Sequence, residues 1–379
     1  MKSAILFGAG ADIGCNLLGR NDPERDGFAI TDVVTRRITA DPELASLSSL
    51  DQLHGRLLLA DPALLGRVSV DETGSRLIID GRPVTVHFRE VEDDSIFDLG
   101  RFDLAILATH RTHIRSPKTL ARLGRLADRV VGLAENPAIP ALYPPLAGAD
   151  TRLLGLTAPV PDTGRVYAMG SCQSVGWAAQ LRGLLEAAGL AGLDELGLLR
   201  AEVEVVHPDT ASSRLGTQGI GARREDARDN LRPGFSQLQS TMLRLPGTSA
   251  LNTVSLRVLT QPPGYQVCRF FVRARLDADT IRAGFTRAAD LLPDVVRTTD
   301  LPIGSRAFFL SPAAATVITA DSHLKVVDDV LPGSGVTEVI TQAYVHNTIG
   351  YCVSVLAAGR LLVTDSEQAT LLPPLRTSA

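Results

Sequence analysis

Hydrophobic residues follow two different patterns along the chain. In the first part, short unbroken apolar runs alternate with helical stretches, which is typical of strands buried in a parallel sheet and connected by helices. This alternation predicts an α/β domain with a doubly wound Rossmann sheet. The predicted strands are residues 3–7, 28–31, 102–109 and 130–131, and the predicted helices begin near residue 16 and span residues 117–126.

The second part of the chain is richer in strands. A helix is predicted at residues 177–190, and the strand-like runs after it favour an α+β domain with a mostly antiparallel sheet. We expect one domain over residues 1–170, a crossover rich in Pro, Gly and Ala over residues 136–163, and a second domain over residues 171–348. The predicted strands are residues 202–206, 253–259, 267–275, 316–319, 324–327 and 336–340, with helices at 278–292 and at 349–361, the last packing back on the first domain.

Composition limits the class of protein. A chain of 379 residues exceeds one ordinary core and favours two domains. A hydrophobic fraction of 45% and a charged fraction of 21% indicate a soluble globular protein, and a net charge of −4 favours neither a nucleic-acid partner nor a membrane partner. Because the four cysteines lack C-x-x-C spacing and no secretory leader is evident, we expect a cytoplasmic location.

A glycine-rich turn follows the first predicted strand and opens into a predicted helix. Gly8, Gly10 and Gly14 lie in this turn. There, backbone N–H groups and the helix dipole favour the pyrophosphate of a dinucleotide. Asp32 lies about 20 residues further on, at the end of the second predicted strand, where an acid accepts a hydrogen bond from a ribose hydroxyl. This order predicts a dinucleotide site that prefers NAD.

Two features leave the cofactor open. The glycine spacing is G-x-G-x-x-x-G, one residue longer than the usual pattern, so the phosphate geometry can differ. Arg36 and Arg37 follow Asp32 closely and could bind a 2′-phosphate. NADP therefore stays an alternative.

Cys172 and His207 are the candidate catalytic residues. Cys172 directly precedes the apolar helix, where the helix dipole and a nearby imidazole would lower its pKa and provide a thiolate nucleophile near neutral pH. His207 ends the predicted strand at residues 202–206. Sequence spacing cannot show that the two meet, because such residues are adjacent in space only. A buried, inert thiol is the alternative for Cys172 and our interpretation of Cys15, Cys268 and Cys352.

Six segments, in the same order, resemble those of the glyceraldehyde-3-phosphate dehydrogenase family. The first match is the glycine turn with the acid that follows it, and the second is Ser171-Cys172, which resembles the family's S-C-T-T-N-C motif. Four further segments of this chain correspond to family motifs. They are L-D-Q-L-H-G at 50–55 for the family's D-S-x-H-G, V-H-P-D-T at 206–210 for H-A-Y-T, L-R-V at 256–258 for F-R-V-P, and H-N-T-I-G-Y at 346–351 for D-N-E-x-G-Y.

The resemblance to a divergent member of this family implies NAD-dependent oxidation of an aldehyde. Cys172 would attack the aldehyde carbon, and His207 would act as the base while a thiohemiacetal collapses to a thioester. A homotetramer is also implied. The implied cofactor ligands are Gly8, Gly10, Asp32, Thr109 and Asn347, with Asn347 at the nicotinamide carboxamide, and the implied substrate ligands are Ser171, Thr210, Arg223 and Arg257.

The departures from the family concern the substrate. Gln173 stands where the family has threonine, and G-F-S-Q at residues 234–237 replaces a run of Thr or Ser, so both phosphate sites are altered. We therefore expect a specialised small-molecule aldehyde or acyl substrate. The alternative is a non-redox descendant of the fold that acts as an acyl-transfer enzyme or a dinucleotide-binding module. His110 and His113 lack a completing ligand at the usual spacing, so no metal site is expected.

Overall fold

The computed structural model describes residues 1–37, 46–156, 165–208, 232–234, 236–245, 252–258, 263–301, 316–319, 323–364 and 370–374. The chain is an α/β protein with a mostly parallel sheet of ten strands and a second, mixed sheet that is mostly antiparallel. This confirms the predicted α/β class and the character of the second sheet. One compact unit comprises Met1–Ile139, Asp162–Met169 and Val355–Ala369, and the other comprises Pro140–Pro161, Gly170–Ser354 and Thr370–Ala379.

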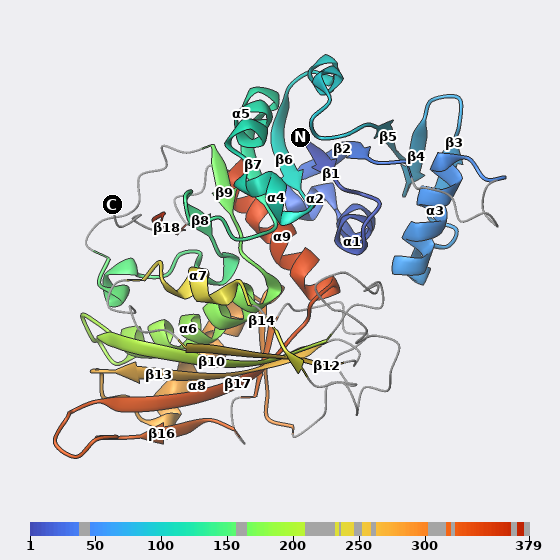
Figure 1. Ribbon diagram of the computed structural model, residues 1–379. Coiled ribbons are helices and arrows are strands. Elements are labelled where there is room, and N and C mark those ends of the chain that lie inside the picture. Colours follow the sequence, from blue (N-terminus) through green and yellow to red (C-terminus); the bar gives the residue numbers. More distant parts are fainter. Residues whose placement is uncertain are drawn as a thin grey trace. The chain divides into compact units, whose positions relative to one another are not determined.

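Eight strands of the first sheet belong to the first unit. From β9 to β5 all neighbouring strands are parallel, and β4 and β3 extend the sheet with antiparallel pairs. Their spatial order is β9 (Val166–Ala168), β7 (Ala127–Gly132), β6 (Phe102–Leu107), β1 (Lys2–Phe7), β2 (Phe28–Thr35), β5 (Arg82–Phe88), β4 (Arg76–Ile79) and β3 (Val68–Asp71) (Figure 1).

Helices connect these strands. The predicted helix α5 (Pro117–Leu126) is confirmed, and it begins as its sequence requires, because Ser116 Oγ accepts from the Thr119 N–H and Pro117 occupies the first turn. The remaining helical segments are α1 (Asp12–Arg20), α2 (Pro23–Asp26), α3 (Ser49–Ala60), η2 (Pro62–Leu64), η3 (Asp94–Leu99) and α4 (Arg111–Arg115).

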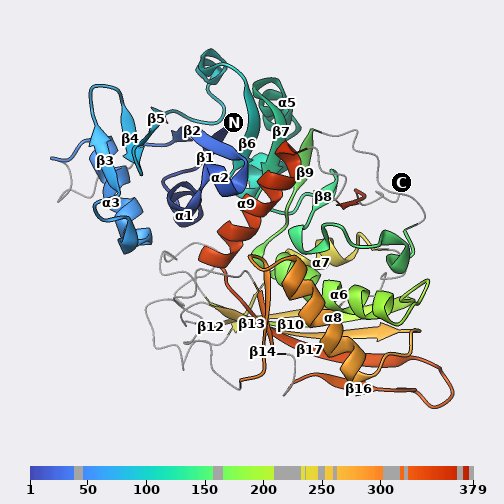
Figure 2. The ribbon, with the colours of Figure 1, turned by 180° about the vertical axis from the view of Figure 1, so that it is seen from behind.

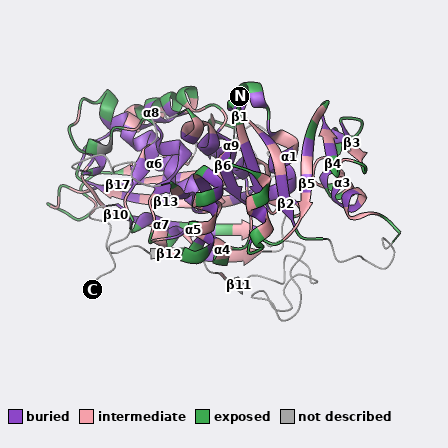
Figure 3. Ribbon diagram, turned by 90° about the horizontal axis from the view of Figure 1, so that it is seen from above, coloured by how far each residue is buried: buried purple, intermediate pink, exposed green. Residues whose placement is uncertain are grey.

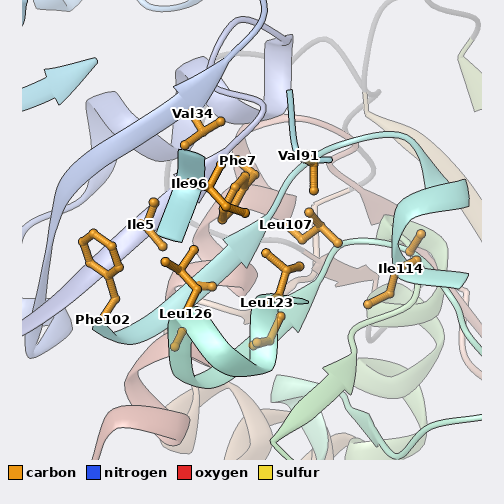
Figure 4. Packing of buried hydrophobic residues seen from close by; sticks show 14 residues of the cluster. Ile5, Phe7, Val34, Val91, Ile96, Phe102, Leu107, Ile114, Leu123 and Leu126 are labelled. Carbon is orange, nitrogen blue, oxygen red and sulfur yellow. The ribbon is translucent and has the colours of Figure 1, made fainter. Parts of the chain in front are cut away.

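The core of the first unit lies between the central strands and α5. Phe7 of β1 and Leu107 of β6 pack with Leu123 and Leu126 of α5, and all four are buried (Figure 4). This packing explains the unbroken apolar runs of the central strands, which are covered on both faces.

The second half of α9 (Ile349–Val363) also packs on the first unit. Gly359 permits a close approach, because a Cβ there would lie 2.6 Å from Phe28 Cε1 and 3.2 Å from Leu104 Cδ2. Arg360 adds an ion pair with the buried carboxylate of Asp26 at 3.3 Å. Among the described helices, none is long and apolar enough to cross a membrane.

The second unit is built on the second sheet. Helix α6 (Cys172–Leu190) lies against β13 and β17, and α8 (Ala278–Leu291) packs on α6 (Figure 2). The pairs β10–β12 and β14–β15 are parallel. The strand order is β11 (Arg232–Pro233), β12 (Asn252–Val258), β10 (Leu198–Pro208), β13 (Gly264–Val272), β17 (Thr337–Val345), β15 (Thr316–Thr319) and β14 (Val296–Thr299), with β16 (Lys325–Val327) paired to β17.

Smaller elements complete the second unit. Strands β8 (Ala141–Leu142) and β18 (Leu371–Leu372) pair antiparallel and are counted in the first sheet. The short helical segments are η4 (Pro144–Leu146), η5 (Thr151–Leu154) and α7 (Leu238–Met242).

Two glycines bring α6 and α8 together. A Cβ on Gly183 would lie 1.8 Å from Phe285 Cδ1, and one on Gly284 would lie 2.3 Å from the Gly183 carbonyl oxygen. Helix α6 is therefore buried along most of its length, whereas α8 keeps an exposed face (Figure 3). This rigid contact fixes the helix that carries Cys172.

One predicted strand end was wrong. Strand β2 does not end at Asp32 but continues through Val33 and Val34 to Thr35. The β-branched residues after Asp32 favour a strand, and the charged residue is accommodated because its carboxylate bonds to His87 on neighbouring β5. The sequence analysis also missed β3, β4, β5, β8, β9, β11, β14 and β18.

Candidate functional site

Cys172 is the first residue of α6, and the local sequence fixes its position. Ser171 caps the helix: its Oγ accepts from the Ser174 N–H at 3.3 Å, and Ser174 Oγ accepts from the Ser171 N–H at 3.0 Å. Gly170 precedes the cap with φ +73°, and a Cβ there would lie 2.6 Å from Ser174 Oγ. The Tyr351 hydroxyl donates to the Gly170 carbonyl at 3.0 Å. Ser171 thus serves as a cap, and its side chain is committed to the helix.

The structure brings His207 to Cys172. His207 lies near the end of β10, and its Nε2 is 3.8 Å from Cys172 Sγ. The other ring nitrogen, Nδ1, is 2.6 Å from the Pro208 carbonyl oxygen, which can only accept a hydrogen bond. Nδ1 therefore carries the proton in the neutral ring, and Nε2, the nitrogen near the thiol, is the acceptor.

Asn347 completes the arrangement from the segment between β17 and α9. The Gly264 N–H donates to Asn347 Oδ1 at 2.8 Å, which fixes the orientation of the amide. The Nδ2 group therefore points at the pair, 3.3 Å from Cys172 Sγ and 2.9 Å from His207 Nε2. A Cβ on Gly264 would lie 3.2 Å from Oδ1, so this contact requires glycine. The amide expected to meet a nicotinamide is committed to protein partners here.

The surroundings of Cys172 shift the pKa of its thiol in both directions. Desolvation raises the pKa of its thiol, and the hydrogen bond from Asn347 and the charge of Arg257 lower that pKa by less. Desolvation thus opposes the lowering of the pKa that was expected from the helix terminus and the imidazole. A protonated thiol could react as a nucleophile only with a base beside it, and His207 Nε2 is the nitrogen 3.8 Å away.

Arg257 lies beside this pair. It occupies β12 and stands opposite His207 in the parallel β10–β12 ladder. A Cβ on Gly234 would lie 2.7 Å from Arg257 Nε, so the loop after β11 approaches the guanidinium closely. Arg257 thus provides a positive charge near the thiol. The other expected substrate ligands, Thr210 and Arg223, lie outside the described residues.

Gln173 leads into a buried network that the sequence analysis did not anticipate. Gln266 Nε2 donates to the Gln173 carbonyl at 2.8 Å and to Gln173 Oε1 at 2.7 Å. Gln180 Nε2 donates to Gln266 Oε1 at 3.1 Å, and Thr341 Oγ1 donates to Gln180 Oε1 at 2.8 Å. All four side chains are buried. Isolated glutamines give no periodic signal in a sequence, and Gln173 is held by this network directly after Cys172.

The other three cysteines are buried, as predicted. Cys15, Cys268 and Cys352 are at most 2% exposed and form no disulfide. Burial raises the pKa of Cys15 to about 12, and it also raises that of Cys268. Partial exposure and a histidine partner distinguish Cys172 from all of them.

The glycine turn lies in the first unit. Gly8 has φ +90°, and a Cβ there would lie 2.4 Å from the Ala108 carbonyl oxygen, so this glycine allows β1 and β6 to converge. A Cβ on Gly14 would lie 2.1 Å from the Gly8 carbonyl, so α1 packs tightly on the turn. Ala11 at the helix N-cap provides no side-chain hydrogen bond. A strand, a tight turn and a helix start without a side-chain cap fit a phosphate group.

Two other expected cofactor ligands, Thr109 and Asp32, also lie in the first unit, and each already has a histidine partner. Thr109 follows β6, and its Cγ2 would be 3.1 Å from a Cβ on Gly8, while its hydroxyl is 2.7 Å from His113 Nδ1. Asp32 lies within β2, where its Oδ1 is 2.8 Å from His87 Nε2. Among the described residues, no three His, Cys, Asp or Glu side chains gather as a metal site.

Sequence comparison of the chain with protein-family models and with curated proteins gives no match.

Proposed function

We propose that the protein is a nicotinamide-dependent aldehyde dehydrogenase that acts through Cys172. The observation that carries the proposal is the approach of His207 Nε2, the unprotonated nitrogen of the neutral ring, to within 3.8 Å of Cys172 Sγ. The glycine turn between β1 and α1 supports a Rossmann-type dinucleotide site in the first unit. The resemblance of the sequence motifs to glyceraldehyde-3-phosphate dehydrogenases agrees with both.

The first step is addition of the thiol to an aldehyde. As Sγ forms a bond to the carbonyl carbon, His207 Nε2 takes the thiol proton. The carbonyl oxygen becomes an oxyanion, which the protonated His207, the Cys172 backbone N–H and Asn347 Nδ2 can stabilise. Proton return to oxygen gives a neutral thiohemiacetal. No resting thiolate is required, in agreement with the raised pKa of Cys172.

The second step converts the thiohemiacetal to a thioester. His207 takes the hydroxyl proton while the carbon loses a hydride, and the C–O bond becomes a carbonyl. A bound nicotinamide supplies the hydride acceptor for this step. A second nucleophile then attacks the thioester carbon, and the Cys172 sulfur leaves as the acyl product is released.

The substrate is proposed to carry a small anionic group. Arg257 offers a guanidinium beside His207, which suits a carboxylate or phosphate on the substrate. Gln173 is bound within the glutamine network rather than held by a phosphate contact. A specialised aldehyde therefore fits better than glyceraldehyde 3-phosphate.

A non-redox acyl transferase is the second candidate. It is favoured by Asn347, whose oxygen is held by Gly264 and whose Nδ2 group already meets Cys172 and His207, so that no amide hydrogen is left to donate to a nicotinamide carboxamide. The same cysteine and histidine would accept an acyl group from a thioester donor and pass it to a second nucleophile.

Two assays on the whole chain separate these functions. In the first, NAD or NADP is mixed with a panel of phosphorylated and unphosphorylated aldehydes, and absorbance of reduced cofactor is followed. In the second, release of free thiol from acyl thioesters is followed without dinucleotide. Dehydrogenase activity is expected in the first assay, lost in Cys172→Ala and kept in the matched control Cys352→Ala. Activity only in the second assay would establish the acyl transferase instead.

A further inference from the structure

The carboxyl end of β2 differs from the end predicted from sequence. Ile5 pairs with Asp32 and Phe7 pairs with Val34, and the Gly8 N–H bonds the Val34 carbonyl at 2.8 Å. The glycine turn thus begins level with Val34. At roughly 3.3 Å per residue, Asp32 lies about 10 Å before the end of β2. Ligands of open parallel sheets bind beyond the carboxyl ends of the strands, so Asp32 is displaced from the usual ribose position.

The carboxylate of Asp32 is also engaged within the sheet. His87 Nε2 lies 2.8 Å from Asp32 Oδ1, and both side chains are largely buried, with exposed fractions of 16% and 20%. His87 extends from β5, the next strand of the sheet. The interaction with His87 is therefore a sufficient reason for an acid at this position of the strand, and no bound nucleotide is needed to explain it.

Arginines occupy the true end of β2. Thr35 Oγ1 accepts from the Gly10 N–H at 3.1 Å, which places the strand end against the turn. Arg36 and Arg37 follow immediately and are exposed. From α3, Arg56 Nη1 donates to the Gly10 carbonyl at 2.8 Å. Arg56 thus contacts the turn directly, and Arg36 and Arg37 follow the strand end that bonds to it.

These arginines are available to a ligand. Arg36 pairs with Glu90 at 2.6 Å, but the two side chains are 68% and 53% exposed, and such exposed pairs are easily exchanged. Arg37 forms no ion pair with the described residues. Guanidinium groups match phosphate oxygens with two parallel hydrogen bonds, which suits a phosphate dianion better than a hydroxyl.

We infer that the dinucleotide bound by this turn is NADP rather than NAD, with Arg36 and Arg37 holding the 2′-phosphate. The inference rests on the proposed dinucleotide site, and it replaces the preference for NAD expected from Asp32. Asp32 then acts as the partner of His87 and contributes little to cofactor selection.

Calorimetric titration of the whole chain with NADP+, NAD+, 2′,5′-ADP and 5′-AMP tests the inference without any catalytic step. We expect NADP+ to bind at least tenfold more tightly than NAD+, and 2′,5′-ADP more tightly than 5′-AMP. Arg36→Ala and Arg37→Ala should each reduce the NADP+/NAD+ affinity ratio about tenfold, the usual effect of losing one charge-assisted hydrogen bond. Asp32→Asn should leave that ratio within twofold.

Arg101→Ala is the matched control, because Arg101 is a similarly exposed arginine that pairs with Asp128 at the opposite end of the strands. It should leave both affinities unchanged. Equal affinity for NAD+ and NADP+, or a large change in the ratio with Asp32→Asn, would overturn the inference while leaving the dinucleotide site intact. Binding of neither dinucleotide would overturn both the inference and the proposed dehydrogenase.

Discussion

Asn347 Nδ2 lies 2.9 Å from His207 Nε2, and this contact determines how the candidate site is protonated. Because Gly264 holds the amide oxygen, the amide can only donate to His207, and Nε2 must accept. Nε2 is then the acceptor nitrogen of the ring, as the bond between Nδ1 and the Pro208 carbonyl also requires. The same Nδ2 group also donates to Cys172 Sγ, so Asn347 orients both members of the pair.

Replacing Gly264 by alanine should disable the site through Asn347. The new Cβ would lie 2.9 Å from the Val206 carbonyl oxygen and 3.2 Å from Asn347 Oδ1, which forces the amide away. We expect a fall in kcat of at least about tenfold, since the orientation of nucleophile and base is lost. Gly189→Ala is the control, because a Cβ there meets nothing within 4 Å in the same unit. Equal activity in both variants would show that the amide position is unimportant.

The rate at which Cys172 is alkylated should show that the pKa of its thiol is raised. Only the thiolate reacts with iodoacetamide, so burial should keep alkylation slow at pH 7. The rate should rise about tenfold per pH unit, without a plateau below the ordinary thiol value of 9.0. Peptide mapping by mass spectrometry would follow Cys172 alone, with buried Cys268 and Cys352 as unreactive references. A plateau near neutral pH would instead indicate a resting thiolate.

Substitution of His207 by asparagine should slow the chemical step. The variant keeps a polar side chain of similar length but lacks the base that takes the thiol proton, and such losses amount to roughly 10² to 10⁴-fold in rate. Single-turnover measurements on the wild type and the variant would isolate this step. His323→Asn, at a partly exposed histidine of the same unit, should leave the rate unchanged. An unaltered rate in His207→Asn would exclude the histidine as the base.

The close packing of α6 on α8 should contribute to the stability of the second unit. In Gly183→Ala the added methyl group would overlap the Phe285 ring at 1.8 Å, and overpacking of this kind costs about 1–3 kcal/mol. Gly189→Ala on the same helix has space for its methyl group and should not destabilise the chain. Urea unfolding of both variants would compare their free energies. Equal stability would mean that α8 shifts without cost.

The fold was more predictable from sequence than the site. Unbroken apolar runs identified β1 and β6, and a helical pattern over residues 117–126 identified α5, because burial of strands on both faces and helical periodicity leave local signals. The end of β2 was misplaced because Asp32 resembles a strand terminus, and its partner His87 is 55 residues away in sequence. Pairing between distant residues leaves no local pattern.

The chemistry of the site shows the same limit. Cys172 and His207 were identifiable as residue types, but their 3.8 Å approach depends on α6 and β10 meeting in the fold. The desolvation that raises the pKa of Cys172 is a property of the packed environment, whereas the helix terminus that lowers it is visible in sequence. The role of Gly264 in orienting Asn347 has no signature in the chain beyond a single glycine.

The central claim is that Cys172 is a nucleophile and that His207 is the base that takes its proton. Mass spectrometry of the protein after brief exposure to dinucleotide and an aldehyde panel, with peptide mapping of any acyl adduct, tests it most directly. We predict an acyl group on Cys172 in the wild type, formed much more slowly in His207→Asn and absent in Cys172→Ala. Reduced cofactor formed at an unchanged rate by Cys172→Ala, or an adduct on another residue, would contradict the account.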